Sequence, residues 1–145
     1  GKGRIIKEGT KVALINFGAR LQECIKAADS LVQKGISTTV ADARFAKPLD
    51  EDLIWQLSTT HEIIITIEEG SIGGFGSRLT QFLTNRGLID KGIKFRSMVL
   101  PDYFIDQDTP ENMYKKAGLD ANSIEEKVIE TLKSNIILSK VKSKH

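Results

Sequence analysis

The sequence predicts an α/β domain whose largely parallel sheet is covered by helices on both faces. Apolar runs of strand length alternate with segments whose apolar residues recur every three or four positions, the order of repeated strand-helix-strand units. A glycine-rich turn, 70–76, separates one such strand from the next helix. Because crossovers between parallel strands are right-handed, successive helices can cover either face of one sheet.

The first third of the chain contains two strands with a helix between them. The run 12–17 is apolar and ends at a glycine, as expected of a strand buried on both faces. The stripe of the helix that follows consists of Leu21, Cys24, Ile25, Ala28, Leu31 and Val32. Gly35 supplies its left-handed end, and 36–42 is the next strand. Ile5 and Ile6 predict a further short strand at the edge of the sheet.

The middle of the chain repeats this pattern. Asp50 is placed to cap a short helix, whose buried residues are expected to be Leu53, Ile54 and Leu57. The run 62–67 is β-branched and almost entirely apolar, which predicts a strand inside the sheet. The stripe of the helix after the glycine turn consists of Phe75, Leu79, Phe82 and Leu83.

The last third begins with the strand 93–100, in which lysine and arginine alternate with apolar residues, as in a half-exposed edge strand. Thr109 before Pro110 has the pattern of an N-cap followed by proline at the first helical position. The segment Ser123-Ile-Glu-Glu126 matches a capping box, so we expect the final helix to start there.

Length and composition favour one domain. A chain of 145 residues can bury a sizeable core without a disulfide, and its single cysteine excludes an intrachain one. We place the domain at 1–138 and expect 139–145, which lacks periodicity and contains three lysines, to be a flexible basic tail. Because the strands start soon after Gly1, we expect a domain cut from a longer protein.

The charge pattern bears on the class of partner. Formal charge is +2, and three lysines among the last six residues account for more than that excess, so the body offers no basic field for nucleic acid. No apolar run approaches the roughly 20 residues of a membrane span. We expect neither nucleic acid nor a membrane as partner, and the single thiol favours a reducing compartment such as the cytoplasm.

The glycine turn is the first candidate for chemistry, because backbone amides between a strand and a helix can hold a phosphate. Its spacing, G-x-x-G-G-x-G, differs from the dinucleotide G-x-G-x-x-G, and Glu68 and Glu69 would repel phosphate. We therefore interpret the glycines as serving the turn, with phosphate binding as the alternative. Adjacent strand residues point to opposite faces, so the two carboxylates are not an acid-base pair.

Other reactive residues are few. His61, His145 and Cys24 lie on different elements, which argues against a metal site. We interpret His61 as a polar residue before a buried strand and Cys24 as core packing. Asp42 and Arg44 follow a central strand, and we expect an ion pair between them, with a ligand contact as the alternative. The sequence thus predicts no catalytic, cofactor-binding or metal-binding residue.

Two segments carry a family resemblance. Glu69-Gly-Ser-Ile-Gly-Gly-Phe-Gly76 and Leu100-Pro-Asp-Tyr-Phe-Ile105 resemble the C-terminal domain of 1-deoxy-D-xylulose-5-phosphate synthases, thiamine-diphosphate enzymes related to transketolase. Pro48-Leu-Asp50 and the glutamate pair are also similar to transketolase and to the pyruvate dehydrogenase beta subunit. The resemblance implies a five-stranded sheet in a three-layer α/β/α domain, with one short antiparallel edge strand.

The resemblance also implies a function for the whole enzyme. It condenses pyruvate with glyceraldehyde 3-phosphate, with loss of carbon dioxide, for isoprenoid, thiamine and pyridoxal synthesis. Thiamine diphosphate and Mg²⁺ bind to the preceding domains and not to this one. The implied partners are the upstream domains and a second copy of the chain, and the implied location is the cytoplasm, or a plastid-type organelle in a eukaryote.

The implied role of this domain is therefore structural. A domain of a homodimer should expose apolar residues to its neighbours. Five residues are the candidates for domain or dimer contacts: Glu69, Phe75, Tyr103, Phe104 and Ile105. Two rival interpretations are a small-ligand regulatory module and the C-terminal domain of a transketolase or 2-oxoacid dehydrogenase beta subunit.

Overall fold

The computed structural model describes residues 2–44, 49–69, 74–100, 111–112, 115 and 118–143. The strands in chain order are β1 (Arg4–Lys7), β2 (Val12–Phe17), β3 (Thr38–Asp42), β4 (Ile63–Glu69) and β5 (Lys94–Leu100). The helices are α1 (Leu21–Gln33), α2 (Glu51–Thr60), α3 (Phe75–Asn85), the 3₁₀-helix η1 (Leu88–Lys91) and α5 (Ala121–Ser143). The predicted N-cap at Thr109 and Pro110 lies outside the described residues.

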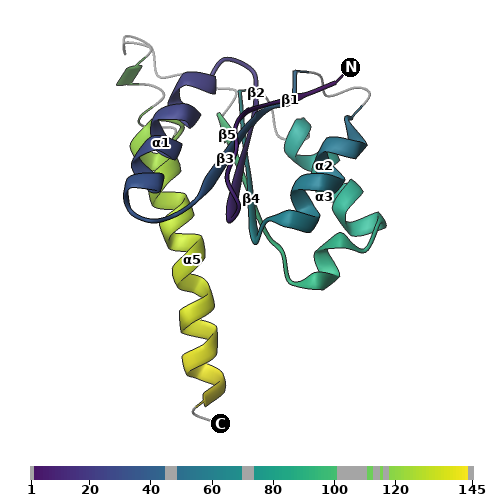
Figure 1. Cartoon of the computed structure of the whole chain (residues 1–145), viewed down its shortest axis with the longest axis vertical. Helices are drawn as coiled ribbons and strands as arrows, with labels where there is room; N and C mark the ends of the chain where they lie inside the picture. The colour runs from purple at the N-terminus through teal and green to yellow at the C-terminus, as the bar shows by residue number, and fades with distance from the viewer. Residues whose placement is uncertain are drawn as a thin grey trace.

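The five strands form one sheet in the order β1-β3-β2-β4-β5 (Figure 1). Strands β2 to β5 are parallel, and β1 pairs antiparallel with β3 at the edge. The predicted positions of three strands are confirmed: β4 lies inside the sheet, and β1 and β5 form its two edges. The predicted fold class is confirmed in full.

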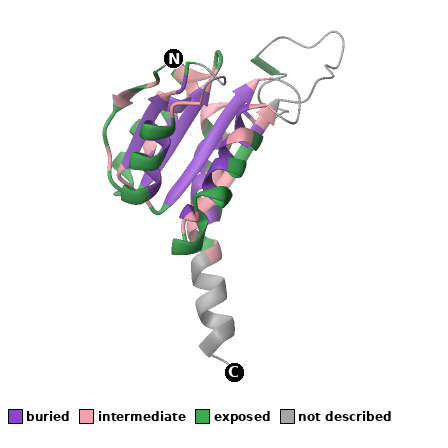
Figure 2. Cartoon of the chain, turned by 90° about the vertical axis from the view of Figure 1, so that its right-hand side faces the viewer, coloured by how far each residue is buried: buried purple, intermediate pink, exposed green. Residues whose placement is uncertain are grey.

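The helices form two layers. Helices α1 and α5 cover one face of the sheet, and α2 and α3 cover the other (Figure 1). Alternate residues of β4 enter the two cores, with Ile63, Ile65 and Ile67 facing α1 and Ile64 facing α3. The middle strands are buried almost throughout (Figure 2), which explains why their sequences are continuous apolar runs.

Local signals set three of the helix ends. Asp50 caps α2, since its Oδ1 accepts a hydrogen bond from the Leu53 amide at 3.1 Å. Gly35 follows α1 with a φ of 83°, and Gly87 follows α3 with a φ of 69°. Both values lie in the left-handed region that favours glycine.

The predicted start of the last helix is wrong. Helix α5 begins at Ala121, and Ser123 lies inside its first turn instead of capping it. The cap is Asp120, whose Oδ1 accepts from the Ser123 amide at 3.0 Å. A second carboxylate, Glu23 on α1, accepts from the Ala121 amide at 3.1 Å. Two acceptors for the free amides let the helix start three residues earlier than the capping box implied.

Helix α5 also continues to Ser143, past the boundary expected at residue 138. Its last turns run beyond the end of the sheet (Figure 1). Mobility of 139–145 stays a prediction. In the part of the chain that the structure describes, no helix has the length and apolar character of a membrane span.

Candidate functional site

Open α/β sheets bind ligands at the carboxyl ends of their parallel strands, and we call this end of the sheet its carboxyl edge. Strands β2, β3 and β4 end there at Phe17, Asp42 and Glu69. The polar groups of this edge therefore come from three neighbouring strands. They divide between the two faces, since successive strand residues point in opposite directions.

Glu68 closes the amino end of α3. Its Oε2 accepts a hydrogen bond from the Phe75 amide at 2.7 Å, and its Oε1 accepts from the Gly76 amide at 2.9 Å. The side chain is only 2% exposed. A negative charge at this position satisfies two amides that no helical carbonyl can reach and interacts favourably with the helix dipole. The carboxylate thus occupies the place where a phosphate would bind.

Gly76, the second residue of α3, serves packing. A Cβ on Gly76 would lie 2.4 Å from Ser97 Oγ, 3.1 Å from Glu68 Oε1 and 3.2 Å from Thr66 Oγ1. Gly74 is the N-cap residue and has a φ of −82°, so it needs no left-handed conformation. Residues 70–73 lie outside the described residues. At Gly76 the structure agrees with the steric interpretation and not with a phosphate cradle.

Glu69 lies at the last position of β4, where the side chain alternation places it on the face opposite Glu68. The two carboxylates therefore cannot flank one bond, as the strand period predicted. Glu69 is partly exposed, and its Oε1 is buried without a hydrogen-bond partner among the described residues. Its role as a domain or dimer contact stays a prediction.

Phe75 is not a surface residue. Its side chain is fully buried, and its ring stacks on Phe17 with centroids 5.3 Å apart. The expectation that Phe75 contacts another domain is therefore wrong for this conformation, because the ring belongs to the same buried stripe of α3 as Leu79. Tyr103, Phe104 and Ile105 lie outside the described residues, so their proposed contacts stay predictions.

Asp42 and Arg44 form no ion pair in the described part of the chain. Arg44 has a φ of 59°, so the segment is not extended as the prediction required. Asp42 Oδ1 instead lies 3.4 Å from Asn16 Nδ2, which also donates to the Gly18 carbonyl at 2.9 Å. Asn16 is fully buried, and the sequence analysis did not identify it as a site residue. Its polar side chain within the apolar run 12–17 is the feature of the sequence that could have done so.

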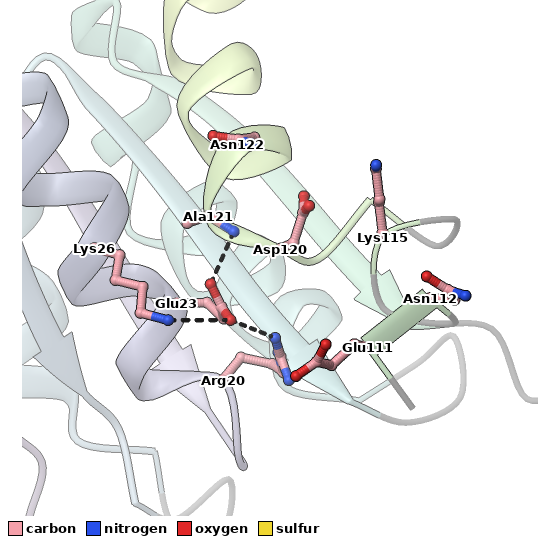
Figure 3. Close-up of a pocket in the computed structure, with 9 residues that line it drawn as sticks. All are labelled: Arg20, Glu23, Lys26, Glu111, Asn112, Lys115, Asp120, Ala121 and Asn122. Atoms are coloured by element: carbon pink, nitrogen blue, oxygen red, sulfur yellow. Dashed lines mark hydrogen bonds and ion pairs between the residues drawn. The ribbon is translucent and has the colours of Figure 1, made fainter. Parts of the chain in front are cut away.

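A hollow of about 610 Å³ lies where the amino ends of α1 and α5 meet (Figure 3). Its lining residues are Arg20, Glu23, Lys26, Glu111, Asn112, Lys115, Asp120, Ala121 and Asn122. Acidic and basic side chains are equally represented, so the lining has no preference for either sign of ligand charge. Glu23 joins the two helices, since it accepts from the Ala121 amide of α5 at 3.1 Å. Its carboxylate also lies 3.3 Å from Arg20 Nη2 and 3.9 Å from Lys26 Nζ, both at the α1 side of the hollow.

His61 is a structural residue at the other end of the strands, between α2 and the start of β4. Its Nε2 lies 2.7 Å from Thr39 Oγ1, and its Nδ1 lies 3.1 Å from the Leu57 carbonyl. Burial lowers the pKa of His61, although hydrogen bonds to the Leu57 and Gly9 backbone oppose this shift. The Thr39 hydroxyl is itself held by the Gly9 backbone, since it accepts from the Gly9 amide at 2.8 Å and donates to the Gly9 carbonyl at 2.9 Å, so these contacts join segments of the fold.

Cys24 and the acidic residues offer no further chemistry. Burial raises the pKa of Cys24 to about 12, which keeps the thiol protonated and unreactive. Within the described ranges, no three His, Cys, Asp or Glu side chains are grouped so that they could hold a metal ion. The donor set here does not resemble a metal centre.

Fold and site together define an open α/β domain whose strand-to-helix anion position is filled by its own carboxylate. Comparison with known families identifies the lineage: the family "Transketolase, C-terminal domain" matches residues 1–124. The chain belongs to this family.

One solved structure is similar to most of the chain. It is described as "Split gene transketolase, inactive beta4 tetramer", and it shares 28% sequence identity with a TM-score of 0.81. The match covers 91% of this chain and 42% of that one. The chain therefore spans less than half the length of this relative.

Proposed function

We propose that this chain is the C-terminal assembly domain of a thiamine-diphosphate enzyme, and that the enzyme is 1-deoxy-D-xylulose-5-phosphate synthase. The observation that supports a non-catalytic role for this domain is that both oxygens of Glu68 accept hydrogen bonds, from the amides of Phe75 and Gly76. This carboxylate occupies the position of the domain best suited to an anionic cofactor.

The residues described here do not fit thiamine diphosphate. Its diphosphate needs hydrogen-bond donors and a divalent cation, yet the α3 amides already bind Glu68. Glu69 adds a second negative charge at the end of the same strand. The proposal therefore assigns the cofactor and Mg²⁺ to other domains of the protein, and assigns the reaction of pyruvate with glyceraldehyde 3-phosphate to those domains.

The choice of enzyme depends on two sequence segments, 69–76 and 100–105, which resemble the deoxyxylulose-phosphate synthase branch. The structural similarity to a transketolase supports transketolase as the main alternative. The third candidate, a 2-oxoacid dehydrogenase beta subunit, shares Pro48-Leu-Asp50 and the glutamate pair. A regulatory role would have the hollow between α1 and α5 as its site.

The proposed partners are the remaining domains of the same protein and a second copy of it. The solved relative is described as a beta4 tetramer, which supports self-association for proteins of this kind. The proposed location is the cytoplasm, or a plastid-type organelle in a eukaryote.

The test of the enzyme assignment uses the whole protein that contains this chain. We expect release of carbon dioxide from pyruvate that requires glyceraldehyde 3-phosphate, thiamine diphosphate and Mg²⁺ together. Carbon dioxide release without glyceraldehyde 3-phosphate points to the dehydrogenase alternative. Turnover of sugar phosphates without pyruvate points to transketolase. Either result removes the synthase assignment and leaves the family unchanged.

The test of the cofactor assignment uses the chain alone. Calorimetry with thiamine diphosphate and Mg²⁺ should give no heat of binding. Micromolar affinity in this experiment contradicts the assignment of the cofactor to other domains, whichever enzyme the whole protein proves to be.

A further inference from the structure

The amino end of α3 has the features of a complete anion site. Two consecutive amides, of Phe75 and Gly76, point at the two oxygens of one carboxylate at 2.7 and 2.9 Å. Helix α3 has 11 residues, enough to place a positive partial charge at this end. Since Glu68 is only 2% exposed, solvent does not weaken these hydrogen bonds.

A third polar group lies at the same point. Thr66 is fully buried, and its Oγ1 has no hydrogen-bond partner among the residues that the structure describes. The position of a Cβ on Gly76 would be 3.2 Å from Thr66 Oγ1 and 3.1 Å from Glu68 Oε1, so hydroxyl and carboxylate border the same small space. Buried hydroxyls normally find a partner. The Thr66 hydroxyl can therefore donate a further hydrogen bond to an anion in this space.

Glycine at position 76 completes the site. Any side chain there would meet Ser97 Oγ at 2.4 Å and close the space between the amides and β4. The site therefore consists of backbone donors, a hydroxyl and a gap that glycine leaves open. The carboxylate of Glu68 occupies this site, and a substitution of Glu68 removes it while leaving the two amides, the Thr66 hydroxyl and Gly76 unchanged.

We propose that the amino end of α3 is a binding site for a small carboxylate, with Glu68 as its resident ligand. A free carboxylate enters the site once the Glu68 side chain is removed. In the wild-type chain the tethered carboxylate has a high effective concentration at the site and excludes external anions. The inference does not depend on which enzyme contains this chain.

The size of the ligand follows from the substitution. Glu68→Ala removes one methylene and the carboxylate, which are the heavy atoms of acetate. Formate leaves a gap of one carbon atom, and propionate adds one carbon atom to a packed space. Phosphate can also accept hydrogen bonds from the two amides, but it is tetrahedral and bulkier than the planar carboxylate that this packed space holds, so it should bind more weakly. The expected order of binding is acetate, then formate, then propionate and phosphate.

The experiment measures melting temperatures of four proteins in sodium acetate and in sodium chloride of equal ionic strength. They are the wild type, Glu68→Ala, Glu68→Gln and the matched control Glu62→Ala. Glu62 is exposed at the other end of the same strand region, beside Lys11 at 3.9 Å. Glu68→Ala should melt roughly 3 °C higher when acetate exceeds its Kd about tenfold. The other three proteins should show no difference between the two salts.

Two outcomes overturn the proposal. One is a response of Glu68→Ala to acetate that sodium chloride reproduces, and the other is an equal response of Glu62→Ala. If Glu68→Ala does not fold in chloride, recovery of its helical circular dichroism in acetate is the same test, and no recovery counts against the site.

Glu68→Gln provides an independent reading by nuclear magnetic resonance. Its amide oxygen can accept from only one of the two backbone amides, so one of the Phe75 and Gly76 amide proton resonances should move and the other should stay near its wild-type position. If both resonances keep their wild-type positions, the two amides do not bind the Glu68 carboxylate in solution, and the proposal fails.

Discussion

Replacing Gly76 with alanine should destabilise the domain, and the structure gives the reason and the size. The new Cβ would lie 2.4 Å from Ser97 Oγ, a distance that requires the serine side chain to rotate. The contacts with Glu68 Oε1 at 3.1 Å and Thr66 Oγ1 at 3.2 Å remain close, and two hydrogen bonds hold Glu68 in place. Overpacking of this kind costs about 1–3 kcal/mol. Alanine recovers about 1 kcal/mol of helix propensity, so from the middle of this range we expect a net loss of about 1 kcal/mol.

Urea denaturation followed by circular dichroism measures this loss as a lower midpoint at constant slope. Ser97→Ala provides the control, because it removes the nearest atom. In the double variant Gly76→Ala, Ser97→Ala, we expect a coupling energy of about 1 kcal/mol in the direction of rescue. An unchanged midpoint for Gly76→Ala, or single losses that simply add in the double variant, would refute the steric account of this glycine.

Three further predictions concern the cap, the histidine and the tail. Asp50→Ala should lower the free energy of unfolding by about 1–2 kcal/mol, because Asp50 caps α2 and also accepts from the Gly3 amide at 2.8 Å. The control Asp52→Ala, in the same first turn, should change it by less than about 0.5 kcal/mol in urea denaturation. Burial lowers the pKa of His61 in the folded chain, so the unfolded chain binds the proton more readily. The contribution of His61 to stability should therefore be fully present above its unfolded pKa and decline as pH falls through that value. His61→Gln should flatten this decline in melting temperatures measured between pH 7.5 and 5.5. A chain that ends at Leu138 should keep its melting temperature within about 2 °C of the full chain, and a larger drop shows that 139–145 packs on the body.

The sequence was sufficient for the fold because each element carries its own periodicity. Strand β2 was predicted at its observed bounds, and Gly35 and Asp50 gave correct helix ends, since these signals act within a few residues. The start of α5 could not be predicted in this way. It depends on Glu23, which is distant in sequence and binds the Ala121 amide only after α1 and α5 pack on the same face of the sheet.

For the candidate site, too, the sequence predicted the local features and not the contacts between distant elements. The alternation of strand residues correctly separated Glu68 from Glu69. The sequence also assigned Gly76 a steric role, although the residue lies in the first turn of α3 and not in the glycine turn. The sequence does not reveal that Glu68 binds the amides of Phe75 and Gly76, because that contact depends on where α3 lies over β4. Phe75 shows the limit most clearly. It fits both a buried stripe and an exposed loop by pattern, and only packing against Phe17 decides between them.

The position of β1 has a consequence for synthesis of the chain. In the described sheet, β1 is an edge strand that pairs with β3, in a register that joins Arg4 to Asp42, although β2 is made between them. As the chain leaves the ribosome, β1 and β2 emerge without a partner, and the first unit that can close is β2 with α1 and β3. Until β4 follows, one edge of β2 stays open to other strands. A translational pause between residues 42 and 63 would therefore expose an apolar strand edge that the finished domain buries in its centre.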